Sequence, residues 1–69
     1  MSLTKKLKMA MIDMNINQVE LAKKTGQAQS TLSKKMTTDN FNLREYERLV
    51  NAIGCTLKIE IILPDGRTV

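Results

Sequence analysis

Two short helical patterns separated by Gly26 constrain this chain more than any other feature of its sequence. The stretch from Asn17 to Met36 reads NQVELAKKTGQAQSTLSKKM. Asn17 is a residue type that caps helix N-termini, and Glu20, three positions later, can complete a capping box. Gly26 can end a helix in the left-handed conformation without the steric penalty of a Cβ atom. The pattern therefore predicts two helices joined by a tight turn.

The second of these helices is expected over about residues 28–36, and its two faces differ in chemistry. Ala28, Leu32 and Met36 recur at i, i+4 and i+8 and predict an apolar stripe. The other face carries amides, hydroxyls and a cation, namely Gln29, Ser30, Ser33 and Lys34. Such groups suit the base edges and phosphates of a DNA major groove, so this is the candidate recognition helix.

The whole motif resembles the Cro/repressor (Xre) type of helix-turn-helix. The residues that carry the resemblance are Gln18, Glu20, Leu21, Ala22, Gly26, Gln29, Ser30, Leu32 and Ser33. With its flanking helices the resemblance extends over roughly residues 3–54. The sequence departs from the family pattern at Gln27, which is usually apolar, and at Lys35, which is often aliphatic. The resemblance implies a mainly α, four-helix DNA-binding domain of the phage-repressor type.

Two further helices are expected on either side of the motif. An apolar stripe predicts a first helix that begins after Ser2 or Thr4 and runs to about Met14. The later segment Phe41-Asn42-Leu43-Arg44-Glu45-Tyr46 repeats the earlier design, with a cap, a box and a hydrophobic staple. A fourth helix is therefore expected from there to Gly54.

From Cys55 onward the apolar residues follow strand spacing instead of helix spacing. Every second residue from Cys55 to Leu63 is apolar, and the segment 63–66 has the sequence of a type I turn. A return strand can then begin at Arg67. We therefore divide the chain into a helix-turn-helix domain, residues 1–54, and a C-terminal β-strand or hairpin, residues 55–69.

This C-terminal segment is expected to make the protein a homodimer. An isolated hairpin is marginal in water, and an apolar edge strand tends to pair with another chain. Antiparallel pairing of two copies through Leu57, Ile59 and Ile61 would satisfy that edge with two-fold symmetry. A hairpin folded back on its own helices is the alternative. A dimer would place two recognition helices about one DNA turn, ~34 Å, apart on a palindromic operator.

Gln29 is the first candidate for a base contact, because its amide can donate to and accept from adenine at once. Ser30 and Ser33 can contact bases or phosphates, with little discrimination. Lys34 is expected to contact a phosphate rather than guanine. The alternative for each of these side chains is a solvated surface position.

Contacts to the DNA backbone are expected from the start of the first motif helix. Gln18 lies in its first turn, where the positive end of the helix favours a phosphate. The family resemblance also implies that Gln18 braces Gln29. Asn17 is a candidate contact as well, although capping alone would explain it.

The composition excludes several other functions. The 69 residues carry a formal net charge of +4, which favours an anionic partner, although it can serve solubility alone. One cysteine and no histidine offer neither an internal disulfide nor a metal cluster, and they leave no catalytic constellation. We therefore expect no enzyme, no metal and no cofactor. The sequence has no membrane-spanning run and no signal-peptide pattern, so a cytoplasmic protein is expected.

The leading hypothesis is a homodimeric, sequence-specific regulator of transcription that represses by occupying a promoter. A close alternative is the antitoxin of a toxin–antitoxin pair, which would bind both its operator and a toxin protein. A more distant alternative is a protein-interaction module that uses the same fold without binding DNA.

Overall fold

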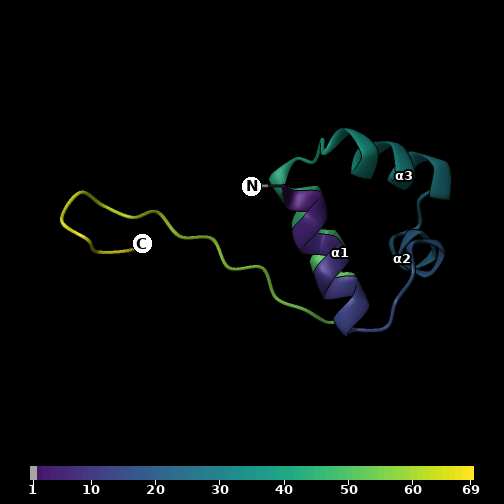
Figure 1. The fold of residues 1–69 in the computed structure, drawn as a ribbon, viewed down its shortest axis with the longest axis horizontal. Helices are drawn as coiled ribbons and strands as arrows, with labels where there is room; N and C mark the ends of the chain where they lie inside the picture. The colour runs from purple at the N-terminus through teal and green to yellow at the C-terminus, as the bar shows by residue number, and fades with distance from the viewer. Residues whose placement is uncertain (1) are drawn as a thin grey trace.

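The computed structural model describes residues 2–69, and this part of the chain contains four α-helices. Helix α1 spans Leu3–Asp13, α2 spans Gln18–Thr25, α3 spans Gln29–Thr38 and α4 spans Leu43–Ala52. The helices pack into one cluster, and the C-terminal segment extends away from it as an arm (Figure 1). The expected mainly α, four-helix architecture is confirmed. None of the helices in the described residues has the length and apolar content needed to cross a bilayer.

Local capping explains where the first two helices begin. The Ser2 hydroxyl oxygen accepts the backbone N–H of Lys5 at 3.2 Å. The Asn17 Oδ1 atom accepts the backbone N–H of Glu20 at 2.8 Å, and Glu20 Oε1 accepts that of Asn17 at 3.3 Å. The predicted capping box is therefore complete. Gly26 ends α2 with a φ of 69°, in the left-handed region that its sequence position predicted.

The second expected capping box forms only in part. Asn42 Oδ1 accepts the backbone N–H of Glu45 at 2.8 Å, and Phe41 meets Tyr46 edge-on with ring centroids 5.6 Å apart. The cap and the staple are thus confirmed. The carboxylate of Glu45 does not complete the box, because it forms an ion pair with Lys35 of α3 instead.

A single core unites the four helices. Its buried apolar residues are Leu7, Met11, Leu21, Ala22, Leu32, Met36, Tyr46, Leu49, Val50 and Ile53. Three residues of the expected apolar stripes lie outside it, and one of them is Leu3, which is 36% exposed at the start of α1. Ala28 is exposed because its backbone is extended and α3 begins one residue later, and Met14 is 44% exposed at the C-cap of α1. Helix α3 also continues to Thr38, beyond the expected end near residue 36.

A polar contact joins the start of α1 to the end of α3. Asp39 caps α3 in the left-handed conformation, with a φ of 53°. Its Oδ1 atom accepts the backbone N–H of Thr4 at 2.8 Å and the Thr4 hydroxyl at 2.6 Å. The same hydroxyl lies 3.0 Å from the carbonyl oxygen of Met36. These hydrogen bonds from Thr4 lower the pKa of the Asp39 carboxyl below its ordinary value.

The predicted β-strand from Cys55 to Leu63 does not form in the described chain. Residues 55–69 contain no strand, and their one β-bridge is an antiparallel bridge between Ile62 and Thr68. The expected turn is closed by a 2.9 Å hydrogen bond from Gly66 N–H to the Leu63 carbonyl oxygen. A strand needs a neighbour for its backbone groups, and a single copy supplies only this short return segment.

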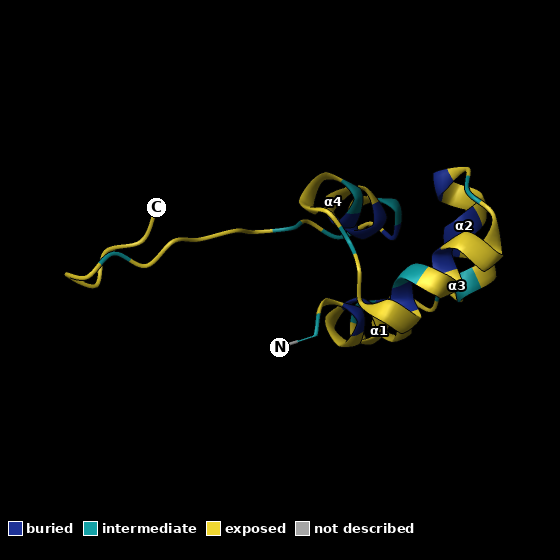
Figure 2. Ribbon diagram, turned by 90° about the horizontal axis from the view of Figure 1, so that it is seen from above, coloured by how far each residue is buried: buried dark blue, intermediate teal, exposed yellow. Residues whose placement is uncertain are grey.

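The arm contacts the helices only at its base. Cys55 and Leu57 pack partly against the core. Beyond them, Ile59 is 54% exposed and Ile61 is 62% exposed, and Figure 2 shows the distal arm almost entirely in the colour of exposed residues. The alternative to dimerisation was a hairpin folded back on its own helices. The arm of this chain does not adopt that arrangement.

Candidate nucleic-acid interface

The outer face of α3 is a continuous polar surface. Leu32 and Met36 point into the core, with exposed fractions of 0% and 5%, and fix the rotation of the helix. The exposed residues on the opposite side follow i, i+3, i+4 and i+7 spacing and are Ser30, Ser33, Lys34 and Thr37. We call these four residues the α3 outer face. It includes three of the predicted contacts, which lie together as expected.

Gln29 lies at the beginning of this surface. It is the first residue of α3 and is exposed. Ala28 precedes it as the N-cap and has no side chain that can cap, so α3 is the one helix of the described four without a side-chain cap. Its first N–H groups and the positive end of its dipole are therefore available to an acceptor. The amide of Gln29 adds a donor and an acceptor at the same place.

The start of α2 presents different groups. Asn17 uses its side-chain oxygen in the capping box, which leaves its amide NH₂ to donate outward. Gln18 is half-buried in the first turn of α2. Within the described residues no hydrogen bond connects Gln18 to Gln29, so the bracing contact that the resemblance implied is not formed in the free protein.

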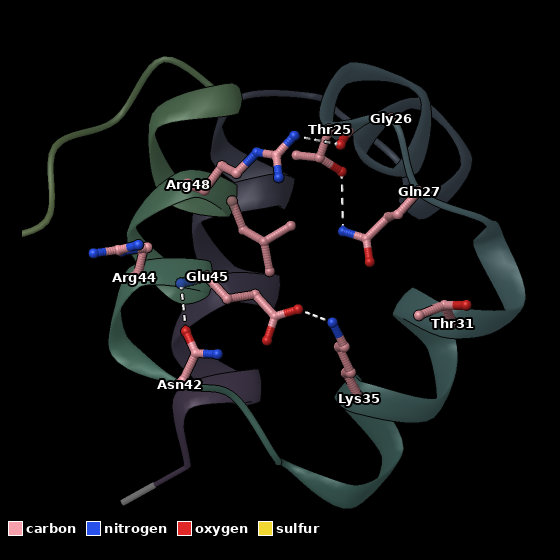
Figure 3. A pocket seen from close by; sticks show the side chains of 10 residues that line it. Thr25, Gly26, Gln27, Thr31, Lys35, Asn42, Arg44, Glu45 and Arg48 are labelled. Atoms are coloured by element: carbon pink, nitrogen blue, oxygen red, sulfur yellow. Dashed lines mark hydrogen bonds and ion pairs between the residues drawn. The ribbon is translucent and has the colours of Figure 1, made fainter.

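The two departures from the family pattern lie away from the α3 outer face. Gln27 and Lys35 both line a hollow of about 390 Å³ between the α2–α3 turn and α4 (Figure 3). Gln27 Nε2 donates to the Thr25 hydroxyl at 3.0 Å, and Lys35 pairs with Glu45. Polar side chains are tolerated here because each has a partner.

The polar contacts of the hollow strengthen the packing of α4 on the turn. Arg48 of α4 donates from Nη2 to the Thr25 carbonyl oxygen at 2.9 Å, close to the end of α2. Lys35 is neutralised by its ion pair and is not part of the α3 outer face. The departure at Lys35 therefore leaves α3 in place, with Met36 buried as the apolar anchor of its second half.

The positive charge on the α3 outer face is modest. Lys34 is exposed and takes part in none of the ion pairs of the described chain. The other exposed lysines near a helix start are Lys5, Lys6 and Lys8, all on α1. Residues 2–69 hold no group of three His, Cys, Asp or Glu side chains able to bind a metal ion. The surface offers hydrogen-bonding groups and positive charge, which suit a polyanion with readable edges.

Sequence reasoning missed the role of Asp39. The sequence pattern predicted an end of this helix near residue 36, but Thr37 and Thr38 are helical and Asp39 ends the helix. The available signal was its residue type, because aspartate and asparagine tolerate the left-handed conformation better than most residues. Its contact with Thr4, 35 positions away, could not be read from local sequence.

Comparison with known proteins gives one match. A family model described as a Cro/C1-type HTH DNA-binding domain matches residues 6–58, which is more than half of the chain. No curated protein and no solved structure matches it. The matched region contains α2 and α3 and ends where the arm leaves the core.

Proposed function

Because the chain belongs to the family of Cro/C1-type helix-turn-helix DNA-binding domains, we propose that it is a homodimeric repressor that reads a palindromic operator. DNA binding follows from the family. The α3 outer face, together with Gln29, is the single observation that carries sequence-specific reading. It combines exposure, helical register and hydrogen-bonding groups on one helix whose opposite side is locked in the core.

Gln29 contributes the most discriminating contact in this proposal. Its position at the first turn of α3 lets its amide approach an adenine edge, where it accepts from N6 and donates to N7. Ser30 lies beside it and contacts a base or a phosphate. Lys34 follows one turn after Ser30 and contacts a phosphate. Ser33 contacts a base edge or a phosphate, whichever lies nearer to its hydroxyl.

Asn17 and Gln18 fix the position of the domain on the duplex. The amide of Asn17 and the first-turn N–H groups of α2 donate to a phosphate, and the helix dipole favours that negative charge. Such contacts carry little sequence information but set the register of α3 in the groove.

The dimer and the mode of regulation are further parts of the proposal. Two domains joined through their arms can engage two half-sites about one turn apart. Occupation of a promoter by such a dimer blocks transcription without any additional contact, so repression is the simplest outcome.

Selection from random duplex DNA followed by sequencing tests the proposed function. We expect enrichment of a palindrome whose half-sites are about 10 base pairs apart. Gln29→Ala should lose the preference at one position of each half-site, with discrimination falling by about 1–3 kcal/mol. Gln27→Ala is the matched control, because its amide contacts Thr25 at the hollow and not the α3 outer face.

Repeating the selection at two salt concentrations distinguishes sequence-specific binding from nonspecific electrostatic attraction to phosphates. Sequence-specific binding should keep its motif as salt rises, even as affinity falls. Binding without an enriched motif that vanishes with salt would contradict the proposal, and so would a motif unchanged in Gln29→Ala. The first of these results would favour a protein partner, such as a toxin, over an operator.

A further inference from the structure

The hydrogen bonds of the arm determine which of its two edges is free. Ile61 exchanges backbone hydrogen bonds with Val69, at 2.8 and 2.9 Å, and the Leu63 N–H donates to the Arg67 carbonyl oxygen at 2.7 Å. In an extended chain, alternate residues direct their N–H and C=O groups to opposite edges. The return segment therefore occupies the edge formed by the odd-numbered residues at Ile61 and Leu63.

The other edge is formed by the even-numbered residues from Thr56 to Ile62. Within the described chain, no backbone hydrogen bond uses Thr56, Lys58, Glu60 or Ile62. On the odd-numbered edge Leu57 and Ile59 are also unbonded, because the return segment reaches back only to Ile61. The even-numbered edge lies directly beside two exposed apolar side chains of the arm, Ile59 at 54% and Ile61 at 62%. A second extended chain can pair here without displacing the return segment.

We propose that two copies pair antiparallel along this even-numbered edge, with the two-fold axis at Ile59. The inference rests on the homodimer of the proposed function and specifies its register. In this arrangement Lys58 exchanges both backbone hydrogen bonds with the partner's Glu60, and Thr56 does so with the partner's Ile62. Together with the two return segments, the pairing forms a four-stranded antiparallel sheet.

Side-chain chemistry selects this register over its neighbours. A two-fold axis perpendicular to the sheet must pass through a residue, because residues that face each other share one side of the sheet. An axis at Lys58 would set two lysines directly opposite, and an axis at Glu60 would set two glutamates opposite. With the axis at Ile59, each Lys58 faces the partner's Glu60. These two side chains already pair within one chain, at 2.8 Å, so they share one face of the arm.

The apolar side chains match equally well in this register. Ile59 faces its own copy, Leu57 faces the partner's Ile61, and Cys55 faces the partner's Leu63. All of these are non-hydrogen-bonded pairs, in which side chains approach most closely. Since Cys55 and Leu57 already pack against the helical core, the apolar face of the paired arms is continuous with the cores of both copies.

The register also sets the distance between the two domains. The two Cys55 residues are eight positions apart along the paired strands, which corresponds to about 27 Å. Moving the axis by one residue would change that separation by about 7 Å.

Disulfide cross-linking of the full-length chain, without DNA, tests the register. In a Cys55→Ala background, Ile59→Cys should form a cross-linked dimer on mild oxidation, because facing Cα atoms in such pairs are ~4.5 Å apart. Leu57→Cys or Ile61→Cys alone should remain monomeric on a denaturing gel, since each would be about 14 Å from its own copy. A mixture of Leu57→Cys and Ile61→Cys should cross-link.

Each other outcome overturns the inference. Cross-linking of Ile61→Cys alone, but not of Ile59→Cys, would move the axis and leave the dimer intact. No cross-linking, together with sedimentation of the unmodified chain as a monomer, would exclude both the register and the dimer. The DNA selection and the cross-linking test have independent readouts. An enriched DNA motif is possible whichever register is found, and a failed selection would not alter what cross-linking says about the register.

Discussion

At the scale of single residues, Thr4 and Asp39 form a hydrogen-bonded contact that joins two helices far apart in the sequence. Thr4 is buried, donates its N–H and hydroxyl to Asp39 Oδ1, and has the carbonyl oxygen of Met36 beside the same hydroxyl. This contact holds the end of α3 against the start of α1, and Tyr46 of α4 also bonds to the start of α1 by donating to the Leu3 carbonyl oxygen at 2.9 Å. The orientation of the recognition helix therefore depends on side chains that lie outside its outer face.

Thr4→Val should destabilise the fold by about 1–2 kcal/mol, because it removes a buried hydroxyl that donates to the Asp39 carboxylate and leaves an acceptor there without that donor. Urea unfolding at pH 7 measures the change. Thr37→Val is the matched control, since Thr37 is exposed and its hydroxyl makes no hydrogen bond within the described chain. Equal losses in the two variants would show that the Thr4 contact contributes nothing.

The lowered pKa of Asp39 predicts a specific acid dependence. The unfolded chain binds a proton at Asp39 at a higher pH than the folded chain does, so stability falls as pH falls. The contribution is present above the ordinary pKa of 3.8 and is lost as pH drops through the lowered value. Asp39→Asn should flatten this part of the curve of unfolding free energy against pH. An unchanged slope would contradict the assignment.

At the scale of elements, the caps and the turn fix α2 and α3 locally. The Asn17 box starts α2, and the turn at Gly26 delivers the chain into α3 within three residues. The polar hollow beside the turn then secures α4 through Arg48 and the Lys35–Glu45 pair. That partly exposed pair contributes no more than about 1 kcal/mol, so apolar packing remains the main source of stability.

Gly26→Ala should destabilise the protein by about 1 kcal/mol through conformation alone. An added Cβ would have no atom within 4 Å, so steric conflict with neighbouring residues does not contribute. Gly26→Asn should cost less, because asparagine tolerates the left-handed conformation. Unfolding free energies of the three proteins give the order directly, and an asparagine variant no better than alanine would refute the conformational explanation.

At the scale of the whole molecule, the helical cluster and the arm have different requirements. The helices bury their apolar faces within one chain, whereas the arm exposes Ile59 and Ile61 and contacts the core only near its base. The helical cluster therefore buries its apolar residues without a partner. The proposed second copy would cover the apolar residues that the arm leaves exposed.

The unfolding temperature should rise with protein concentration, because dimerisation stabilises the folded state by mass action. A tenfold increase in concentration should raise Tm by a few degrees. Ile59→Asp should abolish this dependence, since it sets two carboxylates opposite each other. Met9→Asp is the control, because Met9 is an exposed apolar residue of α1 outside the arm, and it should retain the dependence. A Tm independent of concentration in the unmodified chain would argue against the dimer.

The sequence by itself determined the features that local chemistry decides. Asn17, Gly26 and Asn42 act where their types predict, because caps and left-handed turns involve residues only a few positions apart. The spacing of apolar residues likewise predicted the four helices and put Ser30, Ser33 and Lys34 on one exposed face. The role of those residues on DNA stays a prediction.

Only the tertiary structure decided the contacts between distant segments. Glu45 pairs with Lys35 instead of completing the capping box of α4, and Asp39 accepts a hydrogen bond from Thr4. Both contacts depend on how the helices pack, because packing brings together residues that are far apart in sequence. For the same reason the alternating pattern of the arm predicted a strand that one copy does not form. Its side chains specify an apolar face, but a strand exists only where a neighbouring backbone is present to bond.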